Sequence, residues 1–112
     1  MTSDSHTDDR VKFALEALLD SDRGWRPLVR NMAARWSDAH PLDLVLAITS
    51  ACAAIEENFT VGSSAHEAAH AGYRIASLLA VDFHAMQTLK MDHARAADLT
   101  AYWRIDPFFA TL

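Results

Sequence analysis

The 112-residue chain is 51% hydrophobic and 22% charged, a balance typical of one ordinary globular domain covering residues 1–112. Fifteen acidic residues outnumber ten Lys and Arg residues, and the formal net charge of −5 argues against a nucleic-acid partner. Four of the six histidines, which this charge leaves out, lie between His66 and His93, where any chemistry should be sought.

The chain begins with a polar segment, MTSDSHTDDR, that lacks the basic start and apolar middle of a signal peptide. No apolar run approaches the ~18 residues that a membrane span requires. We therefore expect a cytoplasmic protein with no membrane partner, in which residues 1–7 form a flexible polar tail. A first helix should follow this tail, since Val11, Ala14 and Leu18 recur at three- and four-residue spacing before Gly24.

Two more helices are predicted in the middle of the chain. Pro27 suits the first turn of a short second helix, whose inward apolar face ends at Trp36. His40 and Pro41 start a third helix, which is the most hydrophobic segment of the sequence. Cys52 lies within it, and because a lone cysteine has no intramolecular disulfide partner, we expect it to pack in the core.

A fourth helix should begin at Ser64 and run at least to Ala80. Its apolar face is made of small residues, among them Gly72, so a neighbouring helix can approach closely. We predict a break near Asp92 and then a last helix that Pro107 ends. Because no segment alternates with period two, the sequence predicts an all-α fold, a compact antiparallel bundle of four or five helices.

Residues 106–112 form an apolar C-terminal tail that contains two adjacent phenylalanines, Phe108 and Phe109. Leaving both rings in water would be costly, so the tail should either fold back on the bundle or contact another subunit, and we favour folding back. The tail is also where we expect a protein partner or self-association.

One motif carries specific chemistry: residues 66–70 read HEAAH, an HExxH pattern. On a helix, His66 and His70 lie one turn apart on the same side and can hold one metal ion, here zinc. The motif resembles that of the zincin metallopeptidases, and this resemblance implies that His66 and His70 are ligands and that Glu67 is the general base. The third ligand would come from downstream residues or from another subunit; the candidates in the chain are Asp82, His84, Asp92 and His93.

The same residues have a purely structural interpretation. Ser64 and Glu67 form the pattern S-x-x-E, the capping box that satisfies free backbone N–H groups at a helix start. A helical projection places His66 and His70 at the edge of the apolar face, so they can be boundary residues without a ligand. Zincins also align their substrate along a strand edge, and this sequence predicts no strand.

Two further alternatives use the same helix. Histidine phosphotransfer domains are helical bundles of similar size with an exposed histidine in mid-helix, and His70 is loosely similar, although Tyr73 and Arg74 stand where that family has Lys and Gly. Glu67 and His70 also form the E-x-x-H of di-iron bundles, in which Glu56 and Glu57 would have to supply further carboxylates.

The remaining polar and aromatic residues point to packing. We expect the three tryptophans to lie in the core or at an interface, and the four arginines between Arg23 and Arg35 to form intramolecular ion pairs. The sequence therefore predicts a small helical module for protein interaction or regulation, which binds a protein partner or itself and has no catalysis of its own. A zinc-dependent hydrolase and a phosphotransfer-like relay remain the alternatives.

Overall fold

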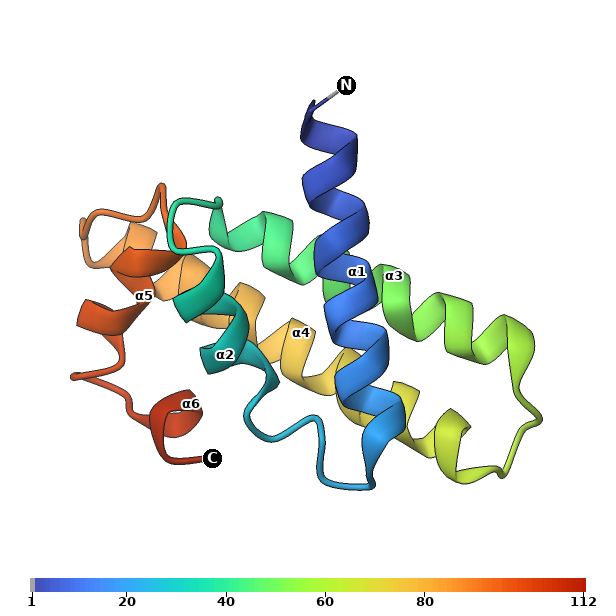
Figure 1. Ribbon diagram of the computed structural model, residues 1–112. Helices are drawn as coiled ribbons and strands as arrows, with labels where there is room; N and C mark the ends of the chain where they lie inside the picture. Colours follow the sequence, from blue (N-terminus) through green and yellow to red (C-terminus); the bar gives the residue numbers. More distant parts are fainter. Residues whose placement is uncertain (1) are drawn as a thin grey trace.

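The computed structural model describes residues 2–112, with side chains from His6 onward, and this part of the chain is helical without strands (Figure 1). The helices are α1 (Thr2–Asp20), α2 (Leu28–Arg35), α3 (Pro41–Asn58), α4 (Ser64–Thr88), α5 (Ala96–Tyr102) and α6 (Phe108–Thr111). The all-α prediction is confirmed. The sequence predicts that Pro107 ends the last long helix, but α5 ends at Tyr102, and Pro107 instead precedes a sixth, single-turn helix that was not expected.

Helices α3 and α4 form an antiparallel hairpin, and α1 crosses it (Figure 1). Gly72 of α4 allows the close approach, since a Cβ at this position would collide with the Sγ of Cys52 on α3 and crowd Leu18 on α1. Cys52 is fully buried, as expected, and burial raises the pKa of its thiol to about 12. The small-residue face of α4 therefore sets the distance between the three longest helices.

The shorter helices pack together at one end of the hairpin. The first backbone N–H groups of α5 donate to the loop between α2 and α3, from Ala96 to the carbonyl of Ala39 (2.6 Å) and from Ala97 to that of Ser37 (2.9 Å). Phe109 of α6 is 1% exposed and packs against Trp103, with 5.8 Å between ring centroids. The C-terminal tail thus folds back on the bundle, as the sequence favoured.

The start of α1 differs from expectation. Helix α1 begins at Thr2, where the sequence predicts a flexible tail over residues 1–7; Met1 lies outside the described residues. Residues 2–7 contain neither glycine nor proline, so nothing in this polar segment interrupts the helix. The predicted break after the fourth helix is confirmed, since α4 ends at Thr88 and α5 begins at Ala96.

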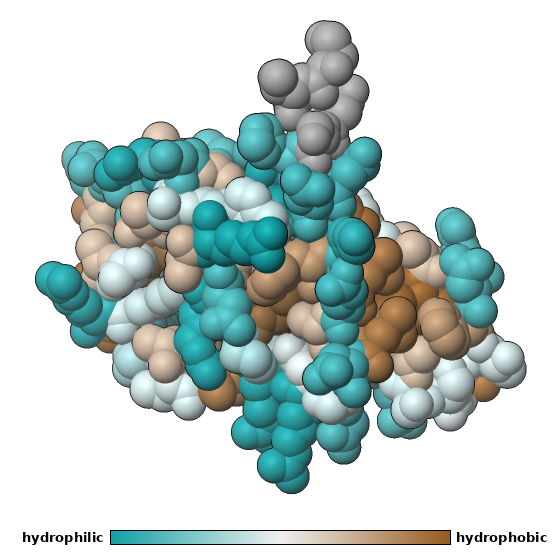
Figure 2. Space-filling model, viewed as in Figure 1, coloured by the Kyte–Doolittle hydropathy of each residue, from teal (hydrophilic) through white to brown (hydrophobic). Residues whose placement is uncertain are grey.

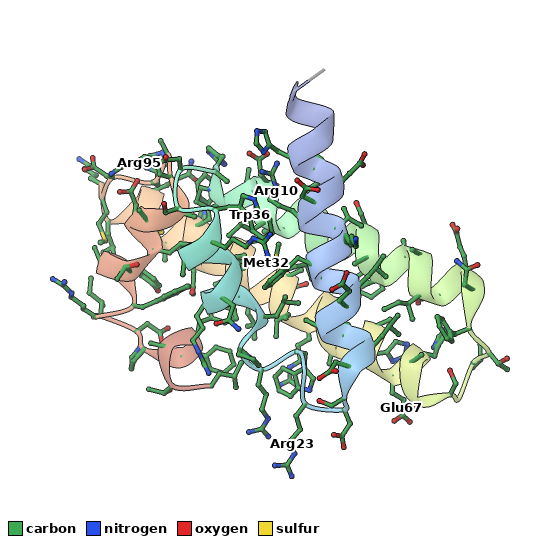
Figure 3. The ribbon with its side chains drawn as sticks, viewed as in Figure 1. Arg10, Arg23, Met32, Trp36, Glu67 and Arg95 are labelled. Atoms are coloured by element: carbon green, nitrogen blue, oxygen red, sulfur yellow. The ribbon has the colours of Figure 1, made fainter. Side chains whose placement is uncertain are left out.

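The four arginines between Arg23 and Arg35 do not form the expected ion pairs. Among the described side chains, the ion pair present joins Arg95 to Asp98 at 3.5 Å. The guanidinium of Arg26 lies over the Trp25 ring, and that of Arg35 lies over the rings of both Phe13 and Trp36. Arg30 donates to the carbonyl of Phe109 at 3.4 Å. These cations are thus held by aromatic rings and a carbonyl, while Arg23 extends from the bundle (Figure 3).

The surface is mixed in character. Polar side chains follow the outer face of α1, and apolar surface lies beside it where it crosses the hairpin (Figure 2). No helix among residues 2–112 combines the length and the apolar character needed to cross a membrane.

Candidate functional site

The HExxH motif occupies the first two turns of α4. The cap of this helix is Ser63, whose hydroxyl accepts a hydrogen bond from the backbone N–H of His66 at 3.2 Å. The capping box predicted for Ser64 and Glu67 is therefore wrong, because the helix cap is one residue earlier and His66 takes the third helical position. Glu67 is exposed and points away from the bundle (Figure 3).

His66 and His70 are brought together as the spacing predicts. Their ring centroids are 5.3 Å apart in an edge-to-face arrangement. His66 is half-buried and His70 is exposed, so both are boundary residues of the helix. Two imidazoles so placed can supply two nitrogen ligands to one divalent ion, and the exposed His70 ring is also open to other reactants.

From His6 onward, the structure does not bring a third ligand of the same chain to this pair. Helix α4 is continuous to Thr88, so Asp82 lies about 18 Å from His70 along the axis, and His84 lies further still. His93 lies in the loop beyond the helix, where its Nδ1 contacts the carbonyl of Met91 at 2.9 Å. Among the described residues, no three His, Cys, Asp or Glu side chains are placed to hold a metal ion. The donors of a single chain thus do not fit a catalytic zinc.

The carboxylates proposed for a di-iron centre either form another hydrogen bond or lie exposed at the surface. Glu56 accepts a hydrogen bond from the hydroxyl of Tyr73 at 2.7 Å, and this bond is the main cause that raises the pKa of Tyr73 to about 12. Glu57 and Glu67 are both exposed. The Tyr73–Glu56 hydrogen bond joins α4 to α3 one turn beyond the histidine pair. Glu56 therefore has a structural role.

Asp82 has a different environment from that of a metal ligand. It is 7% exposed, and its Oδ2 accepts a hydrogen bond from the indole Nε1 of Trp103 at 3.1 Å. Burial raises the pKa of this carboxyl to about 6, although the hydrogen bond from Trp103 opposes the effect; the charge of Asp106 adds to it. Asp82 therefore joins α4 to the end of α5 and titrates near neutrality.

A pocket of about 390 Å³ lies beside His70, between α4, the loop before α2 and the C-terminal helix. Its lining is mainly apolar and comprises Trp25, His70, Ala71, Arg74, Ile75, Leu78, Phe108 and Leu112. Arg74 is exposed and makes no ion pair with a described side chain. The pocket thus combines apolar walls with one cation, Arg74. Such a site can bind an apolar group of a ligand while an acidic group next to it contacts the cation.

This pocket was not predicted from the sequence. Trp25 was interpreted as a packing residue and the C-terminal tail as a possible contact for a partner, but nothing in their spacing from His70 indicates that they meet. The only sequence signal was the unusual pair of phenylalanines, of which Phe109 fills the core while Phe108 stays 42% exposed at the pocket.

Comparison with known proteins gives no further guidance, because no family model, no curated protein and no solved structure matches the chain.

Proposed function

We propose that the protein is a non-catalytic binding module that recognises another protein at the pocket between α4, Trp25 and α6. The observation that supports this proposal is the pocket itself, which leaves Phe108 and an unpaired Arg74 at an apolar surface. Exposed apolar surface in a concave site is typical of protein-binding regions.

The chemistry of the lining supports a partner that presents an apolar side chain next to an acidic residue. An aromatic or aliphatic side chain of the partner would fill the apolar walls made by Ile75, Leu78 and Phe108. An acidic residue beside it would meet Arg74. A net charge of −5 on each copy opposes the pairing of two identical chains, so a second, different protein is the expected occupant.

Site-specific cross-linking tests this proposal. A photoreactive phenylalanine analogue in place of Phe108 should give a discrete adduct in extracts of the native cells, whereas the same analogue at the exposed Ile105 should not. The adduct should disappear with Arg74→Glu and persist with the matched control Arg104→Glu. A mass of twice 12.4 kDa would identify a second copy as the partner and refute the expected occupant. An adduct that is absent, or equal at Ile105, would refute the binding module.

The zinc-dependent hydrolase is less well supported. His66 and His70 can supply two ligands, but a third would have to come from a second copy, because the described residues of one chain do not supply it. A phosphotransfer role would need only the exposed His70, and nothing else in the structure distinguishes that role from a boundary histidine.

A further inference from the structure

Arg10 of α1 is a buried cation that has no hydrogen-bond or ion-pair partner among the described side chains. The residue is 8% exposed, and its Nε is enclosed with no hydrogen-bond acceptor. No described carboxylate forms an ion pair with it. An enclosed guanidinium nitrogen that lacks an acceptor is costly, and proteins normally satisfy such a group with a hydrogen-bond acceptor or an anion. Packing within the fold therefore does not explain why an arginine occupies this buried position.

The environment of Arg10 is a pocket of about 330 Å³ where α1 passes the end of α2. Its lining consists of His6, Arg10, Arg35, Trp36, Ser37, Asp38 and Ala39. Arg10 extends from α1 toward the end of α2, where Trp36 lies (Figure 3). No residue of this lining belongs to the pocket beside His70, so the two sites are independent.

The second arginine of this pocket is held in place. The guanidinium carbon of Arg35 lies 4.8 Å from the centroid of the Trp36 ring and 5.3 Å from that of Phe13. Those two rings pack edge to face, 5.3 Å apart. The opposite wall is also fixed, because the carbonyls of Ser37 and Ala39 accept hydrogen bonds from the start of α5. Little ordering entropy would be lost on binding, which favours affinity.

The net charge of the pocket determines which anion charge it binds best. Arg10 and Arg35 carry two positive charges, Asp38 carries one negative charge, and His6 is neutral in the charge count. The net charge of one positive unit matches a monoanion better than a phosphate dianion. The fork of donors on a guanidinium also fits the plane of a carboxylate.

We infer that Arg10, Arg35 and the Trp36–Ala39 loop form a binding site for a carboxylate. The carboxylate can belong to a small organic acid or to an acidic side chain of another protein, and the recognition chemistry is the same for both. The site is separate from the pocket of the proposed function, and either can fail without the other.

Nuclear magnetic resonance of the full chain tests this inference. Sodium acetate, compared with sodium chloride at equal concentration, should shift the indole N–H signal of Trp36 and the backbone amides of Ser37–Ala39 in a saturable manner. Arg10→Met should weaken acetate binding at least tenfold, whereas the exposed control Arg104→Met should leave it unchanged. A non-saturable response, or binding that Arg10→Met does not weaken, would overturn the inference.

Two further arms complete the test. Arg35 is exposed, so Arg35→Met should fold even if Arg10→Met does not, and it should also weaken acetate binding several-fold; unchanged binding would count against the site. Inorganic phosphate should bind more weakly than acetate, and tighter phosphate binding would refute the carboxylate assignment. The peptide acetyl-Gly-Glu-Gly-amide distinguishes the two sources of the carboxylate. If it binds more tightly than acetate, the site is assigned to an acidic side chain of another protein; if it binds more weakly, the site is assigned to a small organic acid.

Discussion

Replacing Asp82 by Asn should make the protein more stable at neutral pH. The carboxyl is buried, and its pKa of about 6 in the folded chain compares with 3.8 as its ordinary value. An Asn side chain keeps an oxygen that can accept the hydrogen bond of Trp103 and carries no charge. The substitution therefore removes the penalty for burying a charge while the contact between α4 and the end of α5 remains.

The magnitude follows from the linkage between proton binding and folding. A raised carboxyl pKa means that the folded chain binds the proton more tightly, so the contribution of Asp82 to the free energy of unfolding falls as the pH rises from about 4 to about 6 and is then level. Each pKa unit is worth about 1.4 kcal/mol, which gives a loss of up to about 3 kcal/mol above pH 6. Asp82→Asn should recover about 1–3 kcal/mol at pH 7.5 and little at pH 4.

Urea unfolding followed by helical circular dichroism at pH 4, 5, 6 and 7.5 measures this effect. The difference between Asp82→Asn and wild type isolates the one group, because the other titrating residues are common to both. The exposed Asp92→Asn serves as control and should show no such pH-dependent difference. If Asp82→Asn is less stable than wild type at pH 7.5, the charged hydrogen bond to Trp103 outweighs the burial penalty and the reasoning is refuted.

Four other predictions concern the hairpin and the histidine pair. Gly72→Ala should destabilise the fold by about 1–3 kcal/mol, because its Cβ meets the Sγ of Cys52, and Cys52→Ala in the same chain should recover part of the loss; strict additivity of the two changes would contradict this contact. The thiol of Cys52, with its pKa raised to about 12, should react with a thiol reagent only after unfolding, and rapid reaction of the native protein would show that the site opens. His66→Ala and His70→Ala should each leave the free energy of unfolding within about 0.5 kcal/mol, as measured by urea unfolding. The tag-free chain should retain well below one zinc by elemental analysis, and a full equivalent that His66→Ala removes would establish the metal site.

The helical periodicity was sufficient to predict the fold class and most helix positions. The apolar repeats of the third and fourth segments fix which faces are buried, and the break before α5 follows from a polar stretch around Asp92. Local caps were harder, because Ser63 and Ser64 are both good cap residues and sequence alone does not choose between them. That one-residue difference removed the structural role assigned to Glu67.

The candidate sites were predicted only where they are local in sequence. The separation of His66 and His70 is set by one helical turn, so their proximity was predictable. The pocket around Phe108 and the pocket around Arg10 each join segments that are distant along the chain. These pockets form only when whole helices cross in a particular arrangement, and the residue spacing within one segment does not predict that arrangement.

The hydrogen bonds from Ala96 and Ala97 to the loop before α3 have a consequence for folding order. The segment that they enclose contains about 57 residues, and closing such a loop costs about 3–4 kcal/mol of chain entropy before any contact is gained. The α3–α4 hairpin needs a far shorter closure and can form first. The docking of α5 on the loop is then a late event, and its reversal is the cheapest way to open this end of the molecule. The exchange rates of the Ala96 and Ala97 amides with solvent deuterium therefore report how often residues 96–112 detach while the hairpin stays folded.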